Sequence, residues 1–280
     1  MNNKIEKGAL YIVATPIGNM LDITERAKKV LAEVDFIAAE DTRVTGKLMM
    51  LLGIKKPFIS YYEHNKESRH EAILQRLRQG ESAALVTDAG TPAISDPGEK
   101  LVKHCRDNGI KVIPVPGANA AITALSASGL PSGRFVFEGF LKDKKSDRVE
   151  QIENLSRELR TIILYCAPHD IEEQLKELYV AFGNRDIVIA REITKLNETI
   201  ISTTLENVQN DPPVTKGEFV LIISGYIASN DEFWCDISVD EHVEYYKKLS
   251  LDTMSACKQV AKDRGLSKSE IYKQIIDNKQ

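Results

Sequence analysis

The sequence of 280 residues lacks the features of several specialised classes of protein. No apolar run approaches the roughly 20 residues that a membrane-spanning helix needs, and the first residues are polar, so we expect neither a membrane partner nor a signal peptide. The few cysteines are scattered, without a Cys-x-x-Cys pair or metal-ligand spacing. We therefore expect no metal site, and we expect reduced thiols in a cytoplasmic protein. The cysteines are Cys105, Cys166, Cys235 and Cys257.

An excess of basic residues is also missing. The chain has 37 Lys and Arg against 41 Asp and Glu, which gives a formal net charge of −4. General nucleic-acid binders usually carry a basic excess, so this balance argues against a protein of that class, while a local basic patch stays open. We expect no DNA partner. The apolar fraction of 42% and the charged fraction of 28% are those of an ordinary globular protein, and the length suits two modest domains.

Two common nucleotide-binding motifs are absent as well. No loop has the pattern Gly-x-Gly-x-x-Gly or Gly-x-x-x-x-Gly-Lys-Ser/Thr, so the sequence indicates neither a dinucleotide fingerprint nor a P-loop. We therefore do not expect a ligand that is held by its phosphates.

The chain does contain three loops of similar design, in 10–19, 84–98 and 111–120. Each runs from a short apolar strand into a turn of proline, glycine and small residues, and then into a helix. Open α/β sheets bind ligands where their strands end in such loops. Small residues let a ligand approach the backbone, and a proline stiffens each turn. A single loop of this kind is equally consistent with an ordinary strand-to-helix turn, but three of them in one chain indicate a binding site.

Strands and amphipathic helices alternate through the first half, which predicts a largely parallel sheet covered by helices. Beyond a turn at 131–133, longer and more closely spaced strands predict a mixed sheet, followed by a helical tail. We place the domains at 1–131, 132–228 and 229–280. The expected strands are 10–14, 36–39, 58–61, 83–87, 112–114, 135–140, 161–166, 186–191, 198–204 and 218–224. The expected helices are 24–34, 47–52, 66–79, 99–108, 171–182, 239–249 and 252–276.

A charged motif, Glu40-Asp41-Thr42-Arg43, stands at the predicted end of the second strand, at the same sheet edge as the three loops. Side chains at this edge point into the crevice of a parallel sheet. The alternative is an acidic cluster that stabilises the start of a helix. His64 follows another predicted strand, and it is either a proton acceptor or a structural hydrogen-bonding group.

Charged residues also follow a predicted strand of the second half, in Arg191-Glu-Ile-Thr-Lys195. Two cations around one carboxylate form either a surface ion pair or a clamp for an anion such as RNA phosphate. The mixed charges of 143–148 are interpreted as a solvated face or a mobile loop.

The motifs of the first half are Thr15-Pro-Ile-Gly-Asn19, Ala39-Glu-Asp-Thr-Arg43, Asp88-Ala-Gly-Thr-Pro92, Ile94-Ser-Asp-Pro97 and Pro116-Gly117. Those of the second half are Phe135-Val-Phe-Glu-Gly-Phe140, Pro168-His169, Arg191-Glu-Ile-Thr-Lys195 and Gly265-Leu-Ser-Lys-Ser-Glu270. Together they resemble the tetrapyrrole-methylase superfamily and, within it, the ribosomal RNA small-subunit methyltransferase I family. The resemblance covers nearly the whole chain.

This resemblance implies an S-adenosylmethionine-dependent enzyme that methylates the ribose 2′-hydroxyl of a cytidine in the decoding region of small-subunit (16S) ribosomal RNA. It implies the fold of class III methyltransferases, in which two α/β domains hold the cofactor between them, with a short C-terminal helical unit. It also implies a homodimer whose partner is the small ribosomal subunit.

The resemblance assigns residues to the cofactor site by their position in the motifs, while the chemistry of methyl transfer and the charged residues at strand ends suggest the other candidates. The cofactor site would be lined by Pro16, Gly18, Asp88, Gly90, Thr91, Pro92, Ile94, Gly117, Asn119, Ala120, Tyr165, Cys166, Ala167 and Ile193. Candidates for the base that removes the hydroxyl proton are Glu40, Asp41, His64, Glu192 and Lys195. Lys195 would serve only if its surroundings lower its pKa. The expected RNA contacts are Arg43, Arg191 and Lys195.

One departure from the family's pattern concerns a predicted contact. The chain has Cys166-Ala-Pro-His-Asp170 where the family usually has Glu-Ser-Pro-His-Arg, so Asp170 replaces an expected basic residue. Two other functions stay open. One is a sibling methyltransferase that acts on a tetrapyrrole or a protein, and the other is a non-catalytic ribosome-assembly factor that keeps the cofactor cleft.

Overall fold

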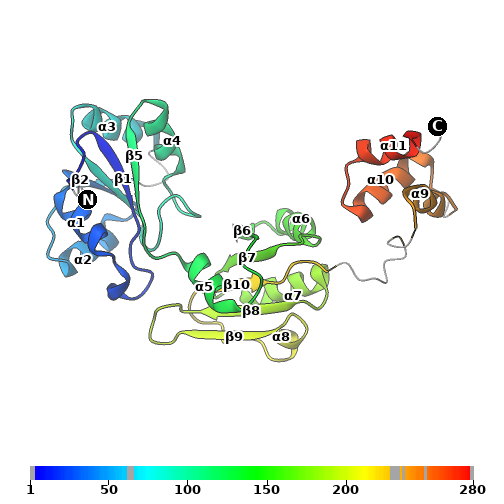
Figure 1. Ribbon diagram of the computed structural model, residues 1–280. Helices are drawn as coiled ribbons and strands as arrows, with labels where there is room; N and C mark the ends of the chain where they lie inside the picture. The colour runs from blue at the N-terminus through cyan, green and yellow to red at the C-terminus, as the bar shows by residue number, and fades with distance from the viewer. Residues whose placement is uncertain (1–3, 62–65, 228–233, 235–236, 249–250, 278–280) are drawn as a thin grey trace. The chain divides into compact units, whose positions relative to one another are not determined.

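A computed structural model describes residues 4–61, 66–227, 234, 237–248 and 251–277 of the chain. The chain divides into two compact units. The larger one consists of Met1–Glu153 and Arg160–Ser224, and the smaller one consists of Asn154–Leu159 and Gly225–Gln280. The larger unit contains both β-sheets (Figure 1).

The first sheet has five parallel strands in the order β3-β2-β4-β1-β5. Every residue of β2 and β4 is buried, as expected for inner strands that are covered by helices on both faces. The predicted parallel sheet is therefore confirmed. The strands are β1 (Ala9–Val13), β2 (Phe36–Ala39), β3 (Phe58–Ser60), β4 (Ala83–Val86) and β5 (Lys111–Val115).

Helices cover both faces of this sheet because successive strand residues point to opposite sides. Tyr11 and Val13 of β1 pack in one core with α1 (Glu25–Glu33) and α2 (Thr42–Leu51). Leu10 packs in the other core with α3 (Lys66–Arg78) and α4 (Glu99–Asp107). Helix α2 begins five residues before the predicted start at Lys47, because the Asp41 side chain caps it by accepting a hydrogen bond from the Arg43 N–H at 2.7 Å.

The second sheet is mixed, as predicted, with the order β6-β7-β10-β8-β9. Strand β6 is parallel to β7, and the other pairs are antiparallel. Helix α5 (Ala120–Ser128) packs on this sheet through Ala121, Ala124 and Leu125. The strands are β6 (Phe135–Phe140), β7 (Thr161–Cys166), β8 (Asp186–Arg191), β9 (Thr199–Thr204) and β10 (Phe219–Ile223). The remaining helices of this part are α6 (Lys145–Leu155), α7 (Ile171–Phe182) and the one-turn α8 (Asn207–Asn210).

The charged run at 143–148 forms the solvated face that was expected, except at Arg148, because residues 143–147 are exposed. It leads into α6, and the Arg148 side chain is only 9% exposed. Arg148 Nε lies 2.7 Å from Glu177 Oε2, and Arg148 Nη2 lies 2.9 Å from Glu173 Oε1. Both partners belong to α7, so one ion-pair network joins the two helices.

The smaller unit contains α9 (Val239–Lys248), α10 (Thr253–Arg264) and α11 (Lys268–Asp277). These helices share a small core that includes Val243, Val260 and Ile271. The single helix expected over 252–276 is two helices, because Gly265 takes a left-handed conformation with φ of 63° and ends α10. Among the described residues, no helix is both long and apolar enough to cross a membrane.

Candidate functional site

The loops that follow β1, β4 and β5 are tied to one another at the carboxyl edge of the first sheet. Thr15 and Gly90 exchange two backbone hydrogen bonds, of 2.8 and 3.1 Å. Thr91 Oγ1 donates a hydrogen bond of 3.0 Å to the carbonyl of Ala118. The three loops that were predicted to form a binding site therefore lie together, because parallel strands end at one edge.

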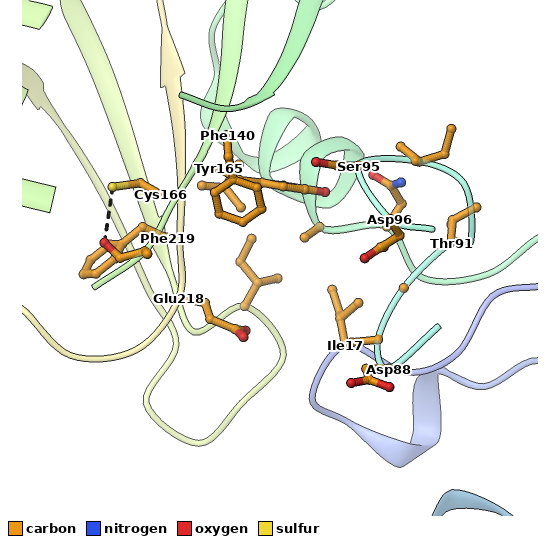
Figure 2. Close-up of a pocket in the computed structure, with 18 of the residues that line it drawn as sticks. Ile17, Asp88, Thr91, Ser95, Asp96, Phe140, Tyr165, Cys166, Glu218 and Phe219 are labelled. Atoms are coloured by element: carbon orange, nitrogen blue, oxygen red, sulfur yellow. Dashed lines mark hydrogen bonds between the residues drawn. The ribbon is translucent and has the colours of Figure 1, made fainter. Parts of the chain in front are cut away.

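A cavity of about 480 Å³ lies against these loops within the larger unit (Figure 2). Its walls come from the loops of the first sheet and from the strands β7 and β10 with their neighbouring loops. This volume falls within the range of small-molecule sites, roughly 300–1,000 Å³. The lining residues are Ile17, Glu40, Asp88, Ala89, Gly90, Thr91, Ile94, Ser95, Asp96, Asn119, Ala120, Phe140, Tyr165, Cys166, Ala167, Pro168, Ile193, Glu218, Phe219 and Val220.

The loop after β4 has an unusual backbone. Ala93 and Ser95 have φ values of 67° and 60°, which non-glycine residues rarely adopt. At Gly98, with φ of 139°, a Cβ atom would lie 2.9 Å from Leu85 Cδ2. Two strained residues in one turn persist only where the surroundings hold them, and such strain collects at functional sites. The loop is therefore held in a fixed shape against the cavity.

Aromatic side chains of the second sheet form part of the cavity wall. The rings of Phe140 and Tyr165 have centroids 5.4 Å apart, and Phe137 meets Tyr165 edge-on at 5.1 Å. The Tyr165 hydroxyl accepts a hydrogen bond of 3.3 Å from the N–H of Ala121 at the start of α5. These contacts hold the Tyr165 ring in place, and such a wall suits a planar apolar ring.

Carboxylates supply the charged part of the lining, from Glu40, Asp88, Asp96 and Glu218. Burial, followed by repulsion from Glu40 and Asp88, raises the pKa of Asp96 to about 6. The cavity therefore combines an aromatic wall with negative charge. No group of three or more His, Cys, Asp or Glu side chains in the described ranges could hold a metal ion.

Most of the residues assigned to the cofactor line the cavity. Those that do are Asp88, Gly90, Thr91, Ile94, Asn119, Ala120, Tyr165, Cys166, Ala167 and Ile193. Pro16, Gly18, Pro92 and Gly117 lie in the same loops but outside the lining. Gly117 has a packing role, because a Cβ atom there would lie 2.8 Å from Ala14 Cβ.

Among the candidate bases, Glu40 lines the cavity, whereas Asp41, Glu192 and Lys195 do not. His64 lies outside the described residues. The guanidinium of Arg43 bonds both oxygens of Asp41, at 2.6 to 3.1 Å, and lowers the pKa of Asp41 to about 2. The alternative stated for this motif, an acidic residue at a helix start, is what the structure shows for Asp41.

Lys195 joins two strand ends beside the cavity. Its Nζ lies 2.8 Å from Glu192 Oε1 and 3.0 Å from Glu218 Oε2. Burial favours a lower pKa of Lys195, but the hydrogen bonds to these carboxylates outweigh it and raise the pKa. Arg191 Nε donates a hydrogen bond of 2.7 Å to the carbonyl of Lys216. Both cations therefore stabilise the loops around the start of β10.

Nine lining residues were not foreseen. They are Ile17, Ala89, Ser95, Asp96, Phe140, Pro168, Glu218, Phe219 and Val220. Six of them stand inside the motifs given above, but a motif alone does not indicate which of its side chains face the cavity. Glu218, Phe219 and Val220 carry no local signal, because β10 reaches the cavity only by pairing between β7 and β8.

Known proteins match this chain over the part that forms the cavity. The family model for tetrapyrrole (corrin/porphyrin) methylases matches residues 9–209. A protein of Halalkalibacterium halodurans named ribosomal RNA small subunit methyltransferase I is 45% identical over 95% of this chain and 94% of its own length. The protein of that name from Bacillus subtilis is 43% identical over 97% and 95%. That from Haemophilus influenzae is 51% identical over 80% and 82%.

Solved structures share the fold at low sequence identity. A cobalt precorrin-4 methyltransferase of cobalamin biosynthesis matches with a TM-score of 0.58 and 19% identity, over 78% of this chain and 95% of its own. The uroporphyrin-III C-methyl transferase of Thermus thermophilus, complexed with S-adenyl homocysteine, matches with a TM-score of 0.54 and 18% identity, over 77% and 97%. The predicted two-domain α/β class is thereby confirmed.

Proposed function

Since the chain belongs to the tetrapyrrole methylase family and, within it, to the ribosomal RNA small subunit methyltransferase I family, we propose that it methylates small-subunit (16S) ribosomal RNA with S-adenosylmethionine as methyl donor. The acceptor in this proposal is the ribose 2′-hydroxyl of a cytidine in the decoding region. The enzyme acts on the small ribosomal subunit in the cytoplasm, as a homodimer. The observation that carries the proposal is similarity over 95–97% of the chain to relatives of this name.

The cavity suits S-adenosylmethionine in size and in chemistry. Its volume of about 480 Å³ accommodates a molecule of this class. The wall of Phe140 and Tyr165 offers a surface for the adenine ring. Asp88 adds a negative charge to the lining, which would suit the positive sulfonium and the amino group of the donor. Glu40 adds to this negative charge from the end of β2.

The donor supplies an electrophilic methyl group on a charged sulfur. The chain's own residues then have to align the acceptor and exclude water. A ribose hydroxyl is a weak nucleophile, so alignment within about 3–3.5 Å of the methyl carbon must supply much of the rate. A walled cavity also removes the water that would otherwise stabilise the charged reactant. The fixed loop after β4 and the anchored Tyr165 ring support such alignment.

The RNA side of the proposal rests on three cations near the cavity. Arg43 has a largely exposed side chain, and Arg191 and Lys195 lie at the second sheet's strand ends. Cations of this kind bind phosphate while their carboxylate partners keep them in place. We assign Arg43, Arg191 and Lys195 to RNA binding and not to the cofactor.

Calorimetry with S-adenosylmethionine, followed by a methyl-transfer assay on small subunits from a strain that lacks the related enzyme, tests this function. We expect one cofactor site per chain and incorporation of one methyl group per subunit. A 2′-O-methyl group blocks alkaline cleavage of the RNA chain, so resistance to alkali at a single cytidine identifies the acceptor.

The two alternative functions give different results in the same experiment. A sibling enzyme for a tetrapyrrole or a protein would bind the cofactor but leave the RNA unmethylated. A non-catalytic assembly factor would bind small subunits without transferring any methyl group to them. Either result would contradict the proposed function.

A further inference from the structure

We propose that Asp96 is the proton acceptor for the ribose hydroxyl, an inference that rests on the proposed methyl transfer. Asp96 lies in the loop after β4, directly after Ser95 with its φ of 60°. Its half-buried side chain points into the cavity, on the same side as Asp88 (Figure 2). The strained turn fixes the position of this carboxylate, as a base must be fixed before the substrate arrives.

The candidate bases that lie outside the cavity are held by partners. Asp41 is bonded through both oxygens to Arg43. Glu192 and Lys195 are paired with each other at 2.8 Å, which lowers the pKa of Glu192. A carboxylate with a lowered pKa is a weak base, and a protonated lysine cannot accept a proton. None of these three lines the cavity.

The carboxylates in the cavity differ in their surroundings. Asp88 accepts a hydrogen bond of 3.3 Å from the N–H of Asp41, and Glu218 accepts one of 3.0 Å from Lys195. Among the residues that the structure describes, no hydrogen-bond donor or cation is paired with Asp96. Its oxygens are therefore available to a hydroxyl that enters the cavity.

Electrostatics gives Asp96 suitable basicity. The groups that act on it are Glu40 and Asp88, which repel its charge, and the Tyr165 phenol. Together with burial, the two carboxylates hold its pKa at about 6. Near neutral pH the group is thus ionised and able to accept a proton, yet it is more basic than an ordinary aspartate.

In the proposed step, Asp96 takes the hydroxyl proton while the oxygen–carbon bond to the methyl group forms. The sulfur–carbon bond breaks, and its electron pair stays on sulfur, which loses its positive charge. The products are the methylated ribose, S-adenosylhomocysteine and the protonated carboxyl group of Asp96. That carboxyl group then releases the proton to water.

Asp96→Asn tests the inference, with Asp107→Asn as the matched control. Asp107 lies at the end of α4, and within the described part of the chain its one ion pair is with exposed Lys103. It does not line the cavity, so its loss should leave the cavity unchanged. We expect Asp96→Asn to keep S-adenosylmethionine affinity within about threefold and to lose about 10²- to 10⁴-fold in single-turnover methyl transfer, the range for a general base. Asp107→Asn should match the wild type in both measurements.

The pH dependence gives a second readout. Wild-type kcat/KM should fall about tenfold per pH unit below about pH 6, because protonated Asp96 cannot accept a proton. Carboxyl NMR of the free protein should show Asp96 titrating at about the same pH. Glu40→Gln should lower that midpoint, because it removes a repelling charge.

The outcomes separate this inference from the proposed function. If neither the wild type nor Asp107→Asn transfers methyl groups to subunits, the proposed function fails. If both do, a fully active Asp96→Asn overturns the inference, and so does a variant that loses cofactor affinity. Should Asp96→Asn not fold, the wild-type profile decides, because a rate that is flat through pH 6 excludes this base. Partial activity of Asp96→Glu, with a shifted profile, would support it.

Discussion

The Cγ atom of Lys195 lies 2.5 Å from the position that a Cβ atom of Gly18 would take. Thr194 Oγ1 lies 2.8 Å from the same point. Only glycine therefore lets the loop after β1 meet the connection between β8 and β9. The neighbouring residues of that meeting point, Ile17 and Ile193, both line the cavity. This close contact joins the loops of the two sheets beside the site.

Gly18→Ala is expected to weaken cofactor binding without unfolding the protein. The added methyl group must push Thr194 and Lys195 away, and overpacking of this kind costs roughly 1–3 kcal/mol. Much of that shift reaches Ile17 and Ile193, so calorimetry should show a loss of about tenfold in affinity. Gly46→Ala is the control, because a Cβ atom at this position in α2 has no neighbour within 4 Å. Equal affinity in the two variants would show that the contact does not shape the site.

Gly90→Ala should lose both stability and cofactor affinity. Gly90 has φ of 82°, which costs a residue with a side chain about 1–2 kcal/mol. Gly109 has φ of 71° and no atom near its Cβ position, so Gly109→Ala carries the same backbone cost away from the cavity. Urea unfolding should therefore give similar losses for both variants. Calorimetry should show weaker binding of S-adenosylmethionine only for Gly90→Ala, and equal weakening would argue against a site at this loop.

Arg43→Ala should weaken binding of the small subunit while it leaves cofactor affinity unchanged. The Arg43 side chain is 87% exposed, although its guanidinium is bonded to Asp41. A phosphate contact is screened by salt, so its loss should reduce the salt slope of subunit binding by about 1. Arg106→Ala, in the last turn of α4, is the control with an exposed arginine at another place. An unchanged slope would assign Arg43 to Asp41 alone.

If Arg43 serves only as the structural partner of Asp41, the stability of the protein should depend on this pair at neutral pH and not at acid pH. Arg43 lowers the pKa of Asp41 to about 2, below the unfolded value of about 3.9. The pair therefore stabilises the fold above pH 4, and this contribution disappears as the pH falls toward 2. Arg43→Ala should reduce stability at pH 7 more than at pH 2 if the pair is structural.

The sequence predicted most of the fold because local patterns determine it. The ten strands were predicted within one or two residues of their observed ends, because a short apolar run between turn residues indicates a buried strand. The start of α2 was placed too late because the helix start at Glu40–Arg43 was only the alternative interpretation of that motif and did not enter the predicted helix bounds. The break of the tail at Gly265 was missed because one glycine does not always end a helix.

The site was predictable where it is built from motifs and not where it depends on tertiary pairing. The loops after β1, β4 and β5 could be predicted because their proline and glycine residues mark turns. The basicity of Asp96 arises from burial and from Glu40, which is remote in sequence, so no local pattern reveals it. Likewise, the approach of β10 residues to the cavity follows from the strand order alone.

The burial of Arg148 leads to a prediction about stability. Its guanidinium bonds Glu173 and Glu177 and the backbone carbonyl of Asp143, at 2.7 to 3.2 Å. Arg148→Met keeps the apolar stem but leaves the largely buried Glu177 carboxylate without its partner. Breaking a buried pair on one side is costly, so we expect the free energy of unfolding in urea to fall by roughly 2–4 kcal/mol.

Lys145→Met is the matched control for Arg148→Met. The Lys145 side chain is 76% exposed, and its Nζ is as far as 4.0 Å from Glu173 Oε1. A surface pair of this kind contributes at most about 1 kcal/mol. Equal losses in the two variants would mean that the network between α6 and α7 adds nothing beyond surface charge.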